Sequence, residues 1–189
     1  AISTDGARIA YTCKKMNGVA YATSTNSEIY LYELATGKTT NLSEGNKGYD
    51  RVPEFSPDGS RLVWQSMAED GYEADQNRLI LYDFKTRTKR DLTQGYDNSV
   101  ESHHWSPNGQ VVYFTSGINA TIQFFVADPR TRSAIAWRQL SDELADYTAF
   151  TVATNGKRED VIVATREDLS HPAELFVFDP KTKSSRQLT

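Results

Sequence analysis

The chain has 189 residues, a formal net charge of −4 and 38% hydrophobic residues, which is typical of a globular protein with a sizeable core. The mild acidity argues against nucleic-acid binding, because phosphate contacts need clustered Lys and Arg. No stretch approaches the ~18 apolar residues of a spanning helix. No signal peptide is visible, although the chain opens within a motif, and the single cysteine, Cys13, can form no intrachain disulfide.

Two short motifs recur in phase along the chain. The turn signature Ser-Pro-Asp-Gly at 56–59 returns as Ser-Pro-Asn-Gly at 106–109, and in worn form at 3–6 and 153–156. A second motif, a polar residue followed by Leu and then Ser or Thr, is spaced 50, 48 and 48 residues apart, at Leu42, Leu92, Leu140 and Leu188. Self-similarity at about 40–50 residues, built on short apolar runs, indicates β-propeller blades or solenoid units.

Each repeat contains apolar runs that predict short strands. In chain order these are 8–11 and 29–32; 52–55, 61–66, 78–84 and a strand ending at 92; 111–114 and 124–126; and 161–163 and 175–178. The middle strands are continuously apolar, as expected for strands that are buried on both faces by radially stacked sheets. A β-sandwich buries one face of each sheet and does not explain the period.

We therefore predict an all-β fold, a β-propeller fragment of about four four-stranded antiparallel blades, over 1–189. The blades span approximately 1–45, 46–95, 96–141 and 142–189, and the first lacks its innermost strand. No segment has a sustained helical period, and 142–147 could form one turn at most. Trp64 and Trp105 are expected to pack between sheets. The recurring Asp83, Asp128 and Asp179 are expected to accept backbone hydrogen bonds in the turns that follow them.

The chain lacks the signatures of common catalytic and metal sites. It has no Gly-x-Ser-x-Gly pentapeptide and hence no nucleophile elbow. Of its three histidines, the adjacent His103 and His104 would point to opposite faces of a strand, and His171 is remote in sequence. One cysteine and no zinc-type ligand spacing give no metal site. We predict no catalytic residue, no metal and no cofactor in this chain.

The best candidate for recognition is an acidic loop, 69–75, which has four carboxylates in seven residues. In a four-strand meander this loop shares one end of the sheet with the inter-blade connections. Those connections bring Lys47, Tyr49, Asp50 and Arg51, and then Tyr96, Asp97, Asn98 and Glu101. Loops on a rigid scaffold often carry recognition, so the candidate substrate-binding residues are Glu69, Tyr72, Glu73 and Asp75. A solvated loop and a calcium site remain alternatives, although the spacing is not that of an EF-hand.

The blades share an order of motifs that is most complete in the second: Ser-Pro-Asp-Gly, an apolar strand, Tyr-Asp with a Thr turn, and a terminal Leu-Thr. This order resembles two groups, the TolB-type periplasmic propellers and the propeller domains of prolyl oligopeptidase family serine peptidases. The stretch at 66–79, Ser-Met-Ala-Glu-Asp-Gly-Tyr-Glu-Ala-Asp-Gln-Asn-Arg-Leu, distinguishes them. It resembles the pattern typical of the bacterial dipeptidyl and acylaminoacyl peptidases. Two departures are Ala68-Glu69, where that group usually has a basic residue, and Gln76 in place of Lys.

This resemblance implies that the parent protein is a serine peptidase whose triad lies in a C-terminal α/β-hydrolase domain outside this chain. The chain would gate and cap that domain, and a loop carboxylate would bind the free amino terminus of a peptide substrate. Nucleic acid and membrane are not expected partners. The family leaves periplasm and cytoplasm open and favours the periplasm. The rival interpretation is a stand-alone TolB-like or WD-type interaction scaffold. A downstream Gly-x-Ser-x-Gly in the parent reading frame would exclude that rival.

The first and last sheets of such a fragment are expected to leave apolar faces open. We assign Ile9, Tyr11, Ile29 and Leu31 to one face, and Val161, Val163, Phe176 and Phe178 to the other. Because large exposed apolar patches are unfavourable in a monomer, we expect a homodimer or a larger species, and two copies that meet head to tail could cover both faces and close a ring.

Overall fold

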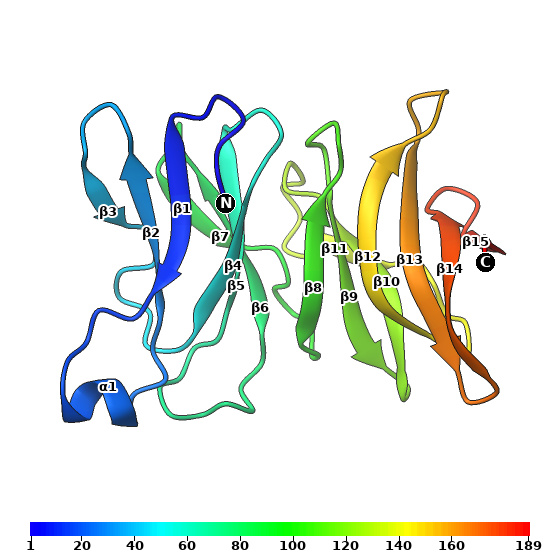
Figure 1. The fold of residues 1–189 in the computed structure, drawn as a ribbon, viewed down its shortest axis with the longest axis horizontal. Helices are drawn as coiled ribbons and strands as arrows, with labels where there is room; N and C mark the ends of the chain where they lie inside the picture. The colour runs from blue at the N-terminus through cyan, green and yellow to red at the C-terminus, as the bar shows by residue number, and fades with distance from the viewer. The chain divides into compact units, whose positions relative to one another are not determined.

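The computed structural model describes residues 1–189, which divide into two compact units, 1–97 and 98–189. Each unit contains two antiparallel sheets whose strands follow one another in chain order (Figure 1). Antiparallel meanders of this kind need only short turns between neighbouring strands, which the turn residues of each repeat provide. The all-β prediction is confirmed.

The first unit holds a three-stranded and a four-stranded sheet. The three-stranded sheet comprises β1 (Arg8–Cys13), β2 (Glu28–Glu33) and β3 (Thr39–Asn41), and the four-stranded sheet β4 (Asp50–Phe55), β5 (Arg61–Ser66), β6 (Arg78–Asp83) and β7 (Thr88–Asp91). As predicted, the first sheet lacks an innermost strand, and only an isolated bridge between Ile2 and Ile9 stands in its place.

The second unit holds two four-stranded sheets. The first comprises β8 (Val100–Trp105), β9 (Val112–Ile118), β10 (Thr121–Ala127) and β11 (Trp137–Gln139). The second comprises β12 (Asp146–Thr154), β13 (Asp160–Asp168), β14 (His171–Asp179) and β15 (Ser184–Gln187). Strands β4, β8 and β12 each carry a register shift against the next strand, so this bulge is a repeated feature of the blades.

The single helix was not expected from the sequence. It is α1 (Val19–Thr23), one short turn in the loop between β1 and β2, and none of its residues is buried. The 142–147 segment is not helical, and β12 begins within it at Asp146. No helix of the structure is long and apolar enough to cross a membrane.

The recurring turns are built by local hydrogen bonds, as the sequence indicated. Asp83 Oδ1 accepts from the N–H groups of Lys85 and Thr86, both at 2.9 Å. Asp179 Oδ1 likewise accepts from the N–H groups of Lys181 and Thr182, and Asp128 Oδ1 accepts from that of Arg130. In the turns after Asp83 and Asp179, the fourth residue after the Asp takes a left-handed conformation, with φ of 57° at Arg87 and 55° at Lys183, where the first blade has Gly37.

The core of the first unit lies between its two sheets. Trp64, 1% exposed, packs there with Phe55 and Leu62 of its own sheet and with Ile29 and Leu31 of the other. The indole Nε1–H of Trp64 donates to the buried Asp50 at 2.7 Å. This partner satisfies the polar tip of a large aromatic side chain, so the ring can be fully buried.

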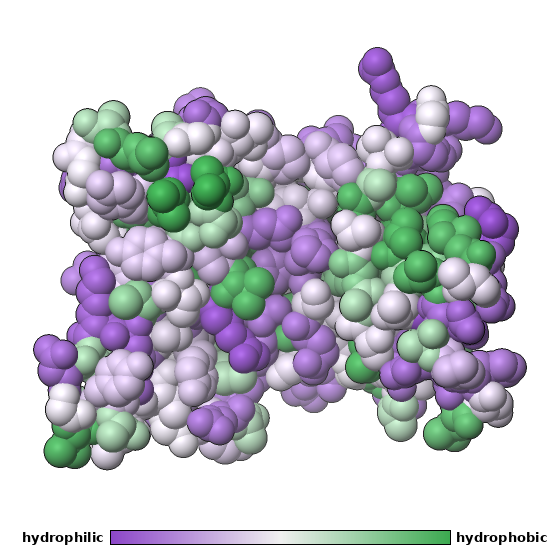
Figure 2. All heavy atoms as spheres, viewed as in Figure 1, coloured by the Kyte–Doolittle hydropathy of each residue, from purple (hydrophilic) through white to green (hydrophobic).

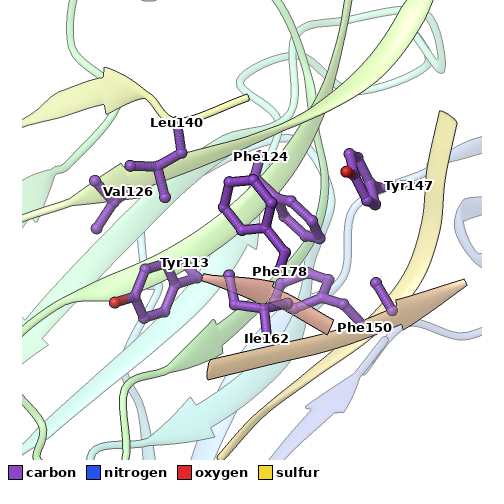
Figure 3. Close-up of a cluster of buried hydrophobic side chains, with 9 residues drawn as sticks. Tyr113, Phe124, Val126, Leu140, Tyr147, Phe150, Ile162 and Phe178 are labelled. Atoms are coloured by element: carbon purple, nitrogen blue, oxygen red, sulfur yellow. The ribbon is translucent and has the colours of Figure 1, made fainter. Parts of the chain in front are cut away.

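The core of the second unit is an aromatic cluster (Figure 3). Phe124 is at its centre, with ring centroids of Tyr147, Phe150 and Phe178 at 4.4, 5.3 and 5.1 Å. These rings come from β10, β12 and β14, so the cluster joins the two sheets of the unit. Aromatic pairs at this spacing contribute beyond the area that they bury.

The outward faces of the first and last sheets differ in part from the expectation. Strand register places Ile29 and Leu31 on the inward face of β2, while Ile9 and Tyr11 lie on the open face. Phe176 and Phe178 also share the inward face with Ile162 and Ala164 of β13. The open face of the last sheet instead carries Val161, Val163, Leu175 and Val177. Figure 2 shows hydrophobic residues gathered on the surface over β13 and β14.

Candidate recognition cleft

The acidic loop, Glu69–Asp75, connects β5 to β6 and is anchored at both of its ends. Asp70 Oδ1 accepts hydrogen bonds from Ser24 Oγ at 2.8 Å and from Thr25 N at 2.6 Å. Gly71 N donates in turn to Thr25 Oγ1 at 2.8 Å. The loop of the second blade is thereby attached to the β1–β2 loop of the first. The Ser24 hydroxyl and the Thr25 N–H lower the pKa of Asp70.

Asp75 holds the two arms of the loop together. Its carboxylate accepts from Ala68 N at 2.6 Å, Glu69 N at 3.1 Å and Gln76 N at 2.7 Å. Burial on its own would raise the pKa of Asp75, but these backbone donors outweigh it and the pKa lies below its ordinary value. This candidate residue therefore serves the loop itself.

The connection from the first blade packs closely under the loop. A Cβ on Gly48 would lie 2.5 Å from the carbonyl oxygen of Met67, so only glycine fits there. Met67 N also donates to Tyr49 O at 2.7 Å, and Asn46 Nδ2 donates to Met67 O at 2.8 Å. These contacts place Tyr49 and the start of β4 beside the loop.

A cleft of about 570 Å³ opens between the loops of the first and second blades. Glu73 contributes a carboxylate to it, and Arg51 and Lys14 contribute cations. The other lining residues are Thr12, Cys13, Thr25, Ser27, Tyr49 and Met67. The volume lies within the range of small-molecule and cofactor pockets.

The predicted site residues fall into two groups. Glu69, Tyr72 and Glu73 are exposed, and no hydrogen bond or ion pair within the chain engages their side chains, whereas Asp75 is engaged by the backbone. Of the four candidates, Glu73 alone lines the cleft. Asp50 and Tyr96, expected at this rim, are 1% and 6% exposed and belong to the interior.

The first blade supplies part of the cleft that sequence reasoning missed. Lys14 Nζ donates to the carbonyls of Tyr21 and Ser24, and its ammonium lies 4.7 Å from the centroid of the Tyr21 ring. These bonds hold the β1–β2 loop around α1. The signal was present in the sequence, because segment 14–27 follows the second strand of its blade just as 67–77 does.

A strained residue lies at the edge of the cleft. Val52 follows Arg51 and has a φ of 54°, although β-branched residues strongly disfavour positive φ. It sits in the β4 bulge and its side chain is 54% exposed. Among the three bulged first strands, only this bulge contains a residue with positive φ. Such strain is concentrated at functional sites.

The fold and the sequence together define the class of protein. Residues 1–189 match the TolB beta propeller domain family, and the chain belongs to it. The β-propeller domain of the Trilobed protease from Pyrococcus furiosus shares the fold, with a TM-score of 0.67 and 20% identity over 96% of this chain and 49% of that one.

Two curated relatives make the resemblance more specific. The chain is 37% identical over 187 residues to dipeptidyl-peptidase 5 of Porphyromonas gingivalis and 38% identical over 189 residues to dipeptidyl-peptidase 5 of Porphyromonas endodontalis. The matches cover 99% and 100% of the chain but 26% of each relative, so the chain spans about a quarter of their length. The predicted resemblance to the propeller of bacterial dipeptidyl peptidases is confirmed.

Proposed function

We propose that this chain is part of the substrate-gating propeller of a dipeptidyl peptidase, and that Glu73 binds the free α-ammonium group of the peptide. The similarity to dipeptidyl-peptidase 5 over the whole chain supports the first part. The second part rests on one observation: Glu73 is the acidic-loop carboxylate that faces the cleft without a partner of its own.

The other loop carboxylates are less suited to bind an amine. Asp70 and Asp75 already accept several hydrogen bonds each, and giving these up would release the loop. Glu69 has no partner but does not line the cleft. We therefore assign Glu69 a supporting electrostatic role, in which its charge adds to the negative potential that attracts an ammonium group.

The cleft also suits the atoms that follow the amino terminus. An extended peptide presents carbonyl oxygens next to its ammonium group, and Arg51 and Lys14 lie on the same cleft as Glu73. A guanidinium donates to a carbonyl through a preorganised fork, so less entropy is lost per hydrogen bond. We infer that Arg51 orients the first peptide carbonyl while Glu73 binds the amine, and that Tyr72 covers the bound end.

Bond cleavage would come from outside this chain. The sequence contains no nucleophile elbow, and in the parent protein an α/β-hydrolase domain would supply the triad. The propeller would then determine which peptides reach that domain and in which direction.

The test uses the full-length parent protein and pairs of peptides that differ only in a free or acetylated amino terminus. Replacing Glu73 by Gln is expected to lower kcat/KM for the free-amine peptide by about tenfold or more, since a hydrogen bond to a charged group contributes about 1.5–3 kcal/mol. The acetylated peptide, which carries no ammonium group, should be hydrolysed with nearly unchanged kcat/KM.

Glu69→Gln is the matched control, because it removes the same charge from the same loop outside the cleft. We expect it to lower kcat/KM for the free-amine peptide by about two- to threefold, through the weaker long-range potential. If Glu73→Gln affected both peptides equally, the loop would have a structural role only. A parent protein that hydrolyses no peptide would favour the interaction scaffold instead.

A further inference from the structure

The second unit contains a cleft that the proposed peptidase role does not use. We call it the turn-end cleft; its volume is about 500 Å³, and it lies between the β8–β9–β10–β11 sheet and the β12–β13–β14–β15 sheet. The first of these sheets contributes Val111, Tyr113, Val126 and Arg138, and the second contributes the residues around Arg158 and Lys183 in its two turns. It therefore lies at the end of the blades that carries the Ser-Pro-Asn-Gly turn.

Three cations face this cleft without partners. The side chains of Arg138, Arg158 and Lys183 all line it, and none of them makes an ion pair or a hydrogen bond within the chain. A fourth cation, Lys181, is neutralised by Glu159 at 2.8 Å. Strand pairing sets Arg138 opposite Val126, and Val126 opposite Tyr113, so Arg138 lies on the face of the sheet that looks into the cleft.

The remaining carboxylate is largely withdrawn from the opening. Asp160 Oδ2 accepts a hydrogen bond from Tyr113 Oη at 2.9 Å, and its other oxygen, Oδ1, is buried. Burial and this hydrogen bond raise the pKa of Tyr113, so the hydroxyl remains a donor to Asp160. The lining as a whole carries four cationic and two acidic side chains, with the exposed charge predominantly positive.

The corresponding groove of the first unit explains why this one is open. There Arg8, the residue that begins β1, donates to Gly59 O at 2.7 Å and lies 4.5 Å from the centroid of the Phe84 ring. Counted from the turn signature, Val111 takes the place of Arg8, and Pro180 takes the place of Phe84. The smaller side chains leave the groove of the second unit unfilled.

We propose that the turn-end cleft binds a small molecule bearing a carboxylate or phosphate group. Guanidinium groups match the geometry of both oxyanions, and a lysine adds a mobile ammonium. Val111 and Val126 provide an apolar wall for the body of the ligand. This site is separate from the recognition cleft of the first unit and does not depend on the peptidase proposal.

The test is calorimetric titration of the 189-residue chain with pyrophosphate and with citrate, at constant ionic strength set by NaCl. We expect saturable binding of at least one probe, and the tighter probe identifies the oxyanion class. Arg138→Gln and Lys183→Gln should each weaken that binding by about fivefold, the upper range for an exposed ion pair. Arg87→Gln is the matched control, because Arg87 occupies the turn position of Lys183 in another blade, and should leave binding unchanged.

Val111→Arg distinguishes a built site from general attraction by charge. This variant adds a positive charge, yet it should abolish binding because the new guanidinium would fill the cleft as Arg8 fills the groove of the first unit. The proposal is overturned if neither probe binds saturably, if Arg87→Gln weakens binding as much as Lys183→Gln, or if a folded Val111→Arg chain binds as well as the unmodified one.

Discussion

Asp58, in the Ser-Pro-Asp-Gly turn, shows how one side chain stabilises a blade. Its Oδ1 accepts hydrogen bonds from Ser56 Oγ at 2.6 Å, from Ser60 Oγ at 2.8 Å and from Ser60 N at 3.0 Å. The Ser56 hydroxyl is the largest of the influences that lower the pKa of Asp58 to about 2. The ionised carboxylate is therefore the form that the folded turn binds.

This depressed pKa predicts a pH-dependent contribution to stability. The unfolded chain takes up a proton on Asp58 near pH 3.8, but the folded chain only near pH 2. The contribution is therefore complete above pH 4 and is lost as the pH falls toward 2. Asp58→Asn should lower the free energy of unfolding at pH 7 by about 1 kcal/mol or less, because the turn is exposed and screened by solvent.

Urea unfolding of the two chains between pH 7 and pH 3 measures this effect. The difference between wild type and Asp58→Asn should shrink as the pH falls. The third blade provides the reverse experiment, since Asn108 occupies the same turn position and accepts from Ser106 Oγ at 2.8 Å. Asn108→Asp should steepen the pH dependence. A difference that is independent of pH in both cases would exclude a charge effect at this position.

At the scale of elements, the acidic loop is held by hydrogen bonds to residues that lie about 45 positions earlier in the chain. Asp70 bonds to Ser24 and Thr25, so two loops that are distant in the chain become one surface. Neither the β1–β2 loop, at 14–26, nor the acidic loop, at 68–75, has a buried apolar residue that could hold it by packing. Polar contacts are thus the main restraint on the recognition cleft, and such segments open locally at low free-energy cost.

Replacing Asp70 by Ala should therefore release both loops without unfolding the blades. We expect faster amide hydrogen exchange in segments 14–26 and 68–76, with little change in β5 and β6. The midpoint of global unfolding should move only slightly, because the core around Trp64 is untouched. Glu69→Gln is the control, since its carboxylate holds no contact. Unchanged exchange in both segments would mean that the Asp70 contacts do not restrain the loops.

The same elements show how far sequence reasoning reaches. The turn roles of Asp58 and Asp83 were predictable because their partners lie two or three residues away. The acidic loop was also found, but its division into structural Asp70 and Asp75 and free Glu73 was not. That division depends on backbone N–H groups and on a loop of another blade, which no local pattern encodes.

At the scale of the whole molecule, the least predictable property was which side chains face outward. Strand β2 reads Ile-Tyr-Leu-Tyr at 29–32, so both of its faces are apolar and alternation cannot distinguish them. A shift of one residue in register exchanges the two faces. The pairing of Ala10 with Leu31 places both side chains on the face of the sheet that packs against Trp64. Ile29 lies on the same face, so Ile29 and Leu31 are buried. The repeat period predicted the number of sheets but not this choice.

The open faces lead to a final prediction about assembly. Ile9 and Tyr11 lie on one open face and Val161, Val163 and Val177 on the other, and these side chains are incompletely buried. Contiguous apolar surface of this kind is removed from water by pairing with another sheet, which contributes about 25 cal/mol per Å² of apolar area. We expect the isolated 189-residue chain to self-associate, with a homodimer that covers both faces as the simplest closed form.

Sedimentation over a hundredfold range of concentration measures this association. The wild-type chain should show a mass that rises with concentration. Val163→Lys should shift the equilibrium toward monomer, because a lysine at a sheet interface must lose its hydration or leave the interface open. Thr86→Lys adds the same charge at an exposed position in the β6–β7 turn, outside both outer sheets, and should not change the mass. A wild-type chain that remains monomeric throughout would show that half-buried valines on a sheet face are insufficient to drive pairing. In that case the open faces would need a covalently continuous neighbouring blade, whose high effective concentration a second copy in solution cannot match.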